Sequence, residues 1–155
     1  MHPNEQLIAR FYDAFNRLDA EGMVACYAPD VTFKDPAFGE LHGAEAASMW
    51  RMLTGNSQGI EVTIRDLAAN DTDGRVHWTA KYTFSTGRPV VNEIDATFTF
   101  ENGLIKTHVD DFDMWKWSRQ ALGPSGLLLG WLPFFHSKVQ RTARGRLAKH
   151  QKAKI

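Results

Sequence analysis

Cysteine is almost absent from this sequence of 155 residues, in which Cys26 is the only one. A single cysteine cannot form an internal disulfide, so nothing here requires an oxidising compartment. The amino terminus lacks the basic, apolar and small-residue succession of a signal peptide. The longest apolar run, Leu127–Phe135, is well short of the roughly 20 residues that cross a bilayer. We therefore expect a cytoplasmic protein with no membrane partner.

Motifs for phosphate, metal or nucleophilic chemistry are also missing. The sequence has no glycine-rich phosphate loop and no nucleophile elbow. His42, His77 and His136 show no metal-site spacing with one another or with Cys26. We expect neither a metal nor a cofactor.

Acidic residues are absent from the last nineteen positions. All 18 acidic and 11 of the 18 basic residues lie between Met1 and His136, and the other seven basic residues follow. Such a basic end can bind nucleic acid or anionic lipid. Because no nucleic-acid motif is present, we expect instead a solvated helix face and a tail that lies over the acidic body or a partner subunit.

The composition is that of an ordinary globular domain. Hydrophobic residues make up 43%, charged residues 23% and aromatic residues 12%, which excludes wholesale disorder. We expect one domain over 1–155, with a core at about 5–117, a C-terminal helical extension at 118–150 and a basic tail at 151–155.

Hydrophobic spacing divides the chain into helices followed by strands. Residues 7–18 have the period of an amphipathic helix, for which Asn4 is a plausible cap. Further predicted elements are a short helix at 19–27, a strand at 31–33 extended to Asp35, a loop at 37–43, a helix at 44–53, and strands at 62–67, 76–85, 90–101 and 104–112. Asn102-Gly103 is a hairpin dipeptide. The remainder, 115–150, reads as two helical pieces separated by Gly123-Pro124. This order predicts an α+β fold with helices against one face of a curved antiparallel sheet.

Several short motifs resemble one known superfamily. They are Phe11-Tyr12-Asp13-Ala14-Phe15-Asn16 with Asp19, the run from Tyr27 to Pro36, Gly43, Asn102-Gly103-Leu104-Ile105, and the run from His108 to Asp113. Together they resemble the nuclear transport factor 2-like superfamily, in its SnoaL-like and ketosteroid-isomerase-like branch. The resemblance implies a cone of sheet closed by helices around an apolar cavity, and a homodimer formed through the outer sheet face. The superfamily hosts isomerases, cyclases, epoxide hydrolases and proteins without catalysis.

The resemblance to ketosteroid isomerases implies two catalytic aspartates. Asp35, in Lys34-Asp35-Pro36, stands at the position of the proton-shuttling carboxylate, and a loop Asp bonded to backbone amides is the alternative reading. Asp95 stands near the second acid, but period two places it on the outer face unless a one-residue bulge before Phe98 turns it inward. Phe11 occupies the position of the isomerase tyrosine, with Tyr12 and Tyr27 as nearby hydroxyls.

The last predicted strand carries a second candidate pair. His108, Asp110 and Phe112 share one face by period two, and Phe112 should point inward. The resemblance to SnoaL-like cyclases and limonene epoxide hydrolases implies an acid–base role for Asp110. The resemblance to the hydrolases also implies an arginine two residues before an aspartate on the neighbouring strand. This sequence has Glu93 at that position, before Asp95. The alternative is a buried pair that satisfies its own hydrogen bonds.

Aromatic side chains are expected to line the cavity as well as the core. The predicted lining residues are Phe11, Phe15, Tyr27, Trp50, Trp78, Tyr82, Phe84 and Phe112. Leu127–Phe135 is too apolar to face water and is expected to cover the cone mouth or pack on a partner. The sequence thus favours a small cofactor-free acid–base enzyme for an apolar molecule. The alternatives are a non-catalytic ligand-binding module and a dimeric protein-interaction module.

Overall fold

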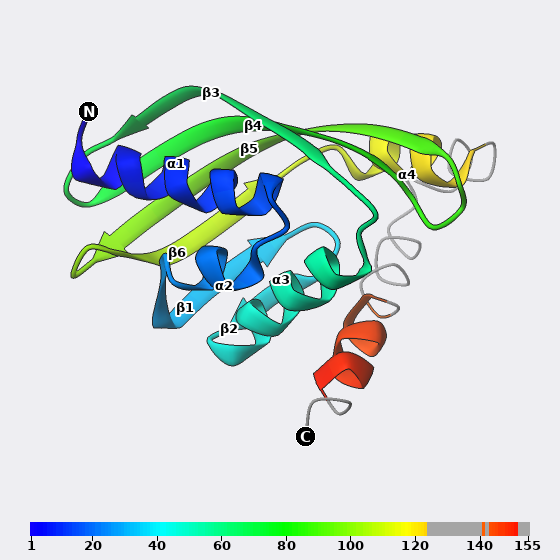
Figure 1. Ribbon diagram of the computed structural model, residues 1–155, viewed down its shortest axis with the longest axis horizontal. Helices are drawn as coiled ribbons and strands as arrows, with labels where there is room; N and C mark the ends of the chain where they lie inside the picture. Colours follow the sequence, from blue (N-terminus) through cyan, green and yellow to red (C-terminus); the bar gives the residue numbers. More distant parts are fainter. Residues whose placement is uncertain (124–140, 142, 152–155) are drawn as a thin grey trace.

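Helices cover one face of a six-stranded sheet in an α+β fold (Figure 1). The protein is described by a computed structural model, in which residues 1–123, 141 and 143–151 are defined. The helices are α1 Pro3–Asn16, α2 Ala20–Val24, α3 Ala44–Asn56 and α4 Met114–Leu122. The strands are β1 Tyr27–Asp35, β2 Gly39–His42, β3 Glu61–Ala69, β4 Asp73–Thr83, β5 Pro89–Glu101 and β6 Leu104–Asp111. A further helical stretch covers 143–151.

The sheet is mixed and open, with the strand order β2-β1-β6-β5-β4-β3. The predicted meander is confirmed over β3 to β6, where every neighbouring pair is antiparallel. Asn102 and Gly103 both have positive φ, 55° and 77°, as a tight hairpin turn requires. The expectation of a wholly antiparallel sheet was wrong, because β1 pairs with β6 in parallel. That pairing joins segments far apart in the sequence, so no local pattern reveals it.

The N-cap of the first helix lies two residues before the expected one, Asn4. His2 is the N-cap: its Nδ1 accepts the Asn4 amide, while Glu5 accepts the His2 amide in a capping box. Pro3 at the first helical position favours the same start. Asn4 therefore lies inside α1, where its side-chain amide donates to the carbonyl of Asn70.

Strand pairing changes the elements predicted on either side of the first strand. The second helix ends at Val24, and Tyr27 belongs to β1, where it pairs with Ile105 of β6. The predicted loop at 37–43 contains β2, which pairs with the end of β1. Pairing with neighbouring strands lets both segments satisfy backbone groups that a short helix or a loop would leave to water.

The core lies between the inner face of the sheet and the helices. Its fully buried members come from both layers, as Phe11 of α1, Met49 of α3, and Phe33, Ile94 and Ile105 of the strands show. Among the described residues, no helix is long and apolar enough to cross a membrane. The expected cover, Leu127–Phe135, lies outside the described residues, as does the tail beyond 151.

Candidate active site

Strand β6 carries a histidine and an aspartate side by side on the inner face of the sheet. His108 is fully buried, and the side chain of Asp110 is only 4% exposed. Their neighbours across the ladder to β5 are Phe98 and Ala96. The period-two prediction that both side chains point inward is confirmed.

A chain of hydrogen bonds runs through five buried side chains, which we call the buried relay. Trp50 of α3 donates from Nε1 to the hydroxyl oxygen of Tyr27 at 2.9 Å. The Tyr27 oxygen lies 2.8 Å from His108 Nδ1, and His108 Nε2 lies 2.9 Å from Asp110 Oδ1. Trp78 of β4 donates from Nε1 to the same Asp110 oxygen at 3.2 Å. The relay thus connects one helix with three strands.

The indole N–H groups of Trp50 and Trp78 can only donate, and they limit which of the other groups in the relay donate and which accept. Because the Tyr27 oxygen already accepts from Trp50, its own proton is available for Nδ1 of His108. A neutral imidazole has one acceptor and one donor nitrogen, so Nε2 then carries the proton and donates to Asp110. The pattern therefore favours the Nε2–H tautomer of His108, with Asp110 Oδ1 as the acceptor of both hydrogen bonds.

Aromatic rings enclose the middle of the relay. The His108 ring lies 4.5 Å from the centroid of Phe98, 5.1 Å from that of Phe33 and 5.4 Å from that of Phe11. Burial in this apolar shell raises the pKa of Tyr27 well above its ordinary value, although the Trp50 hydrogen bond opposes the shift. Tyr27 therefore stays neutral and acts as a hydrogen-bond donor.

The two oxygens of Asp110 have different surroundings. Both of its hydrogen bonds from described residues reach Oδ1, so Oδ2 accepts none from that part of the chain. The hydroxyl of Tyr12 is buried and also has no hydrogen-bond partner among the described residues. Burial, and then the charge of Asp110, raises the pKa of Tyr12 well above its ordinary value. Tyr12 therefore stays a neutral phenol, and its hydroxyl lies within electrostatic reach of Asp110.

Asp35 provides a second carboxyl group near the relay. It is the last residue of β1, is half-buried, and accepts the amide of Phe38 at 2.6 Å. Burial raises its pKa to about 7. The Phe38 amide opposes this shift, while the charge of Asp110 adds to it. A pKa near neutral suits a group that takes up and releases a proton at physiological pH. The hydrogen bond from Phe38 matches the reading of Asp35 as a loop aspartate bonded to backbone amides, and its catalytic role stays a prediction.

Asp95 does not join the other predicted catalytic residues. β5 pairs with β4 without a register shift, and its shift against β6 lies between Thr99 and Phe100, so no bulge turns Asp95 inward. Its side chain is 80% exposed on the outer face, where Oδ1 bonds His77 Nδ1 at 2.9 Å. The expectation that Asp95 shares the inner site was wrong.

The predicted lining residues fall into two groups. Around the relay, Phe15 packs against Trp50 and Trp78 at 5.1 and 5.8 Å between ring centroids, and Phe11 stacks on Tyr27. The second group lies toward or next to α4. Tyr82 accepts a hydrogen bond from Trp117 and Phe84 packs on the same indole, whereas Phe112 follows the end of β6 and is half-buried.

Two hollows are lined by described residues, and none of the five relay residues lines either of them. One groove of about 420 Å³ lies between α1 and β3 and is lined by Tyr12 among others. A second, of about 390 Å³, lies against α1, α2 and the β5–β6 turn. Neither is lined by Asp35, His108 or Asp110, so the apolar cavity at these residues stays a prediction. Within the described ranges, no group of three or more His, Cys, Asp or Glu side chains is arranged to hold a metal ion.

Two features of this site lay beyond the sequence argument. The sequence identifies Tyr12 only as a hydroxyl near the position of the isomerase tyrosine. Its burial without a partner among the described residues depends on how α1 packs over the sheet. The relay partners Tyr27, Trp50 and Trp78 were expected as lining. Their hydrogen bonds link residues at least 23 positions apart. The one available signal was that Tyr and Trp carry polar groups that need partners when buried.

The chain belongs to the SnoaL-like domain family, whose profile matches residues 8–108, more than half of the chain. The helices packed on a mixed sheet agree with the fold of solved structures similar to this chain. None of the curated proteins matches the chain.

Solved structures with the same fold extend over most of the chain. An NTF2-like protein of unknown function from Burkholderia pseudomallei is 25% identical, with a TM-score of 0.68, over 78% of this chain and 98% of that one. An LEH-like epoxide hydrolase from M. tuberculosis is 20% identical, with a TM-score of 0.67, over 81% and 92%. A protein with a ketosteroid isomerase-like fold from Catenulispora acidiphila, in complex with trimethylamine, is 18% identical, with a TM-score of 0.67, over 82% and 97%.

Proposed function

We propose that this protein is a cofactor-independent enzyme that binds a small apolar molecule and moves a proton within it. The observation that carries the proposal is the unequal hydrogen bonding of the two carboxyl oxygens of Asp110. Its Oδ1 is held by His108 and Trp78, while Oδ2 accepts no hydrogen bond from the described residues. The buried hydroxyl of Tyr12, which has no partner among those residues, lies close enough to interact electrostatically with Asp110. A carboxylate oxygen that is held in place and left without a partner can accept a proton from a bound molecule.

The proposed chemistry uses the groups in complementary roles. Asp110 Oδ2 takes a proton from the substrate or from a water that attacks it, and His108 and Tyr27 support the carboxylate through Oδ1. Tyr12 donates a hydrogen bond to the oxygen on which negative charge develops. Asp35, half protonated near pH 7, gives a proton to that oxygen or to carbon. This set serves isomerisation, cyclisation or epoxide opening, and the fold shared with an epoxide hydrolase supports that range.

A non-catalytic module is the second candidate. The complete enclosure of His108 by aromatic rings favours it, because a satisfied buried network also specifies a core. In that case the relay orders the domain, and the protein holds a ligand or a partner without turning it over.

Asp110 and Asp111 offer a matched test of the two candidates. They are neighbours on β6, and only Asp110 is buried. We expect the wild-type protein to convert at least one of two probes, styrene oxide to its diol or nitrobenzisoxazole to its ring-opened nitrile. Asp110→Asn should lower that rate about 100-fold or more, and Asp111→Asn should leave it unchanged. Equal rates for both variants would contradict the enzyme. A tryptophan fluorescence change on adding either probe, without turnover, would favour the binding module.

From the family resemblance we further propose a homodimer formed through the outer sheet face and a cytoplasmic location, with no nucleic-acid or membrane partner. Light scattering of the purified protein tests the dimer, for which the expected mass is twice the chain mass of 17.5 kDa.

A further inference from the structure

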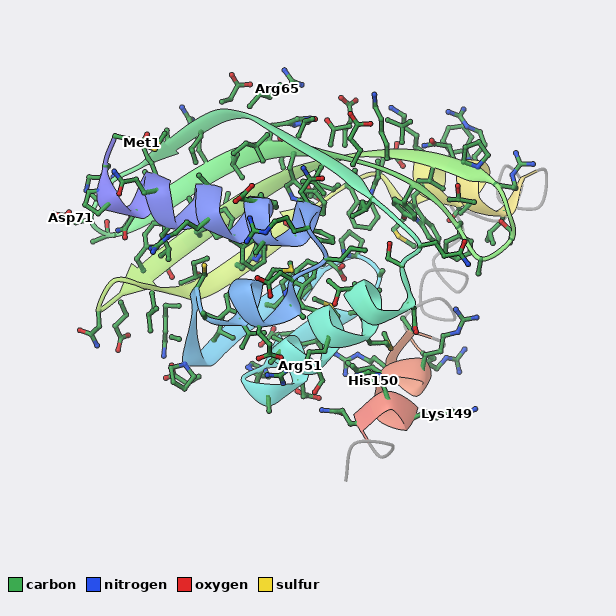
Figure 2. All side chains as sticks on the ribbon, in the orientation of Figure 1. Met1, Arg51, Arg65, Asp71, Lys149 and His150 are labelled. Atoms are coloured by element: carbon green, nitrogen blue, oxygen red, sulfur yellow. The ribbon has the colours of Figure 1, made fainter. Side chains whose placement is uncertain are left out.

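The helical stretch 143–151 packs against the end of the domain that carries Asp35. Leu147 on this stretch is only 3% exposed and belongs to the main core cluster. Gln151 donates from Nε2 to Ser48 Oγ of α3 at 3.4 Å. Figure 1 draws the stretch alongside α3, and Figure 2 shows Lys149 on its far side, pointing away from the domain. This helix is therefore part of the folded domain.

Arg144 connects this helix to the turn between β1 and β2. Its Nε donates to the carbonyl of Phe38 at 2.7 Å, and its Nη2 donates to the carbonyl of Glu40 at 2.6 Å. Two donors of one planar guanidinium thus fix two carbonyls that are two residues apart. Hydrogen bonds from a charged donor are roughly twice as strong as neutral ones.

The same turn holds the carboxyl group of Asp35. Asp35 ends β1, residues 36–38 form the turn, and Gly39 begins β2 with a φ of 72°. Phe38 donates its amide to Asp35 Oδ1 at 2.6 Å and offers its carbonyl to Arg144. One residue is thus held from both sides, by the candidate proton shuttle and by the C-terminal helix.

We propose that Arg144 is a positioning residue, which holds the 36–38 turn in the form that binds Asp35 and shields it from water. The catalytic meaning of this role rests on the proposed function, but the structural role does not. The sequence alone placed Arg144 on a solvated basic face, and the structure assigns it two backbone partners.

The surroundings of Asp35 give the direction of the effect. Asp110 from β6 and Tyr27 from β1 lie close enough to interact electrostatically with Asp35. Burial is the largest influence and raises its pKa, and the amides of Phe38 and Ala37 lower it. Release of the turn admits water and removes the largest influence, so the pKa of Asp35 should fall toward its ordinary value of 3.8.

A titration of Asp35 in four full-length proteins tests the proposal. Carboxyl carbon NMR is followed against pH in the wild type, Arg144→Met, Arg144→Lys and Arg146→Met. Arg146 is the matched control, since it is an exposed arginine on the same helix. We expect Arg144→Met to lower the pKa of Asp35 by about one unit or more. Arg144→Lys, which keeps the charge and part of the donor set, should restore part of that loss, and Arg146→Met should match the wild type.

Two results would overturn the proposal. One is an unchanged Asp35 titration in folded Arg144→Met, and the other is an equal shift in Arg146→Met, which would indicate a general charge effect. If Arg144→Met does not fold, Arg144→Lys decides. Lysine donates from a single nitrogen and cannot reproduce both bonds of the guanidinium, so the pKa of Asp35 should still fall. An unchanged pKa would refute the proposed role of Arg144. No substrate enters the titration, so its failure leaves the proposed function to the separate test on Asp110.

Discussion

Replacement of Asp35 by Asn should make the protein more stable at high pH than the wild type. The native carboxyl group has a pKa of about 7, compared with 3.8 as its ordinary value. Between these values the native state keeps a proton that the unfolded chain has released. Linkage therefore lowers the wild-type free energy of unfolding as pH rises from about 4 to about 7. Asn cannot titrate, and its side-chain oxygen can still accept the Phe38 amide.

The magnitude follows from the gap between the two pKa values. That gap is about three pH units, and each unit corresponds to about 1.4 kcal/mol, so the upper limit is about 4 kcal/mol. The difference in free energy of unfolding between Asp35→Asn and wild type should rise by up to this amount from about pH 4 to about pH 8. Partial exposure of Asp35 makes about half of it a realistic lower expectation.

Urea unfolding of both proteins at several pH values measures this difference directly. Subtraction of the wild-type curve removes the titration of all other groups that the two proteins share. Asp111→Asn, at an exposed position on β6, controls for the loss of a carboxylate as such. A difference that stays constant from acid to alkaline pH would refute the argument that Asp35 is desolvated.

Three further variants test individual contacts. Tyr27→Phe leaves Trp50 Nε1 and His108 Nδ1 without their shared partner, so urea unfolding should show a loss of about 2 kcal/mol or more, and a change below about 0.5 kcal/mol would contradict the relay. Tyr12→Phe removes a buried hydroxyl that has no partner in the described structure, so the free energy of unfolding should stay the same or rise by up to about 1 kcal/mol, while turnover of the active probe falls. A clear loss of stability would show that the hydroxyl has a hydrogen-bond partner. Gln120→Ala removes the side chain that bonds both the amide and the carbonyl of Val91, so amide exchange at Val91 should accelerate, and unchanged protection would show that the side chain does not hold α4 to β5.

Local patterns predicted the parts of the fold that depend on neighbours in sequence. The alternation around Trp78 and the Asn102-Gly103 turn are local, and they gave the β3 to β6 meander correctly. The same period-two argument placed His108 and Asp110 inward and warned that Asp95 faces outward without a bulge.

Contacts between distant segments were beyond the same patterns. The parallel pairing of β1 with β6 brings Phe33 opposite His108 across 75 positions of sequence, and nothing near either residue encodes it. Tyr27 joins the relay because it lies on β1, whereas the apolar spacing of the sequence predicts it at the end of a helix. Arg144 resembled any solvated arginine until the turn at Phe38 was in place.

The most direct test of the central claim is the titration of Asp35 in the wild type and in Asp110→Asn, followed by carboxyl carbon NMR. The account predicts an inflection near 7 in the wild type, because the group is desolvated and lies near a charged Asp110. It predicts a lower inflection in Asp110→Asn, because that charge contributes to the shift. A wild-type inflection near 4, unmoved by the substitution, would contradict a desolvated pair of carboxyl groups and with it the proton-transfer site.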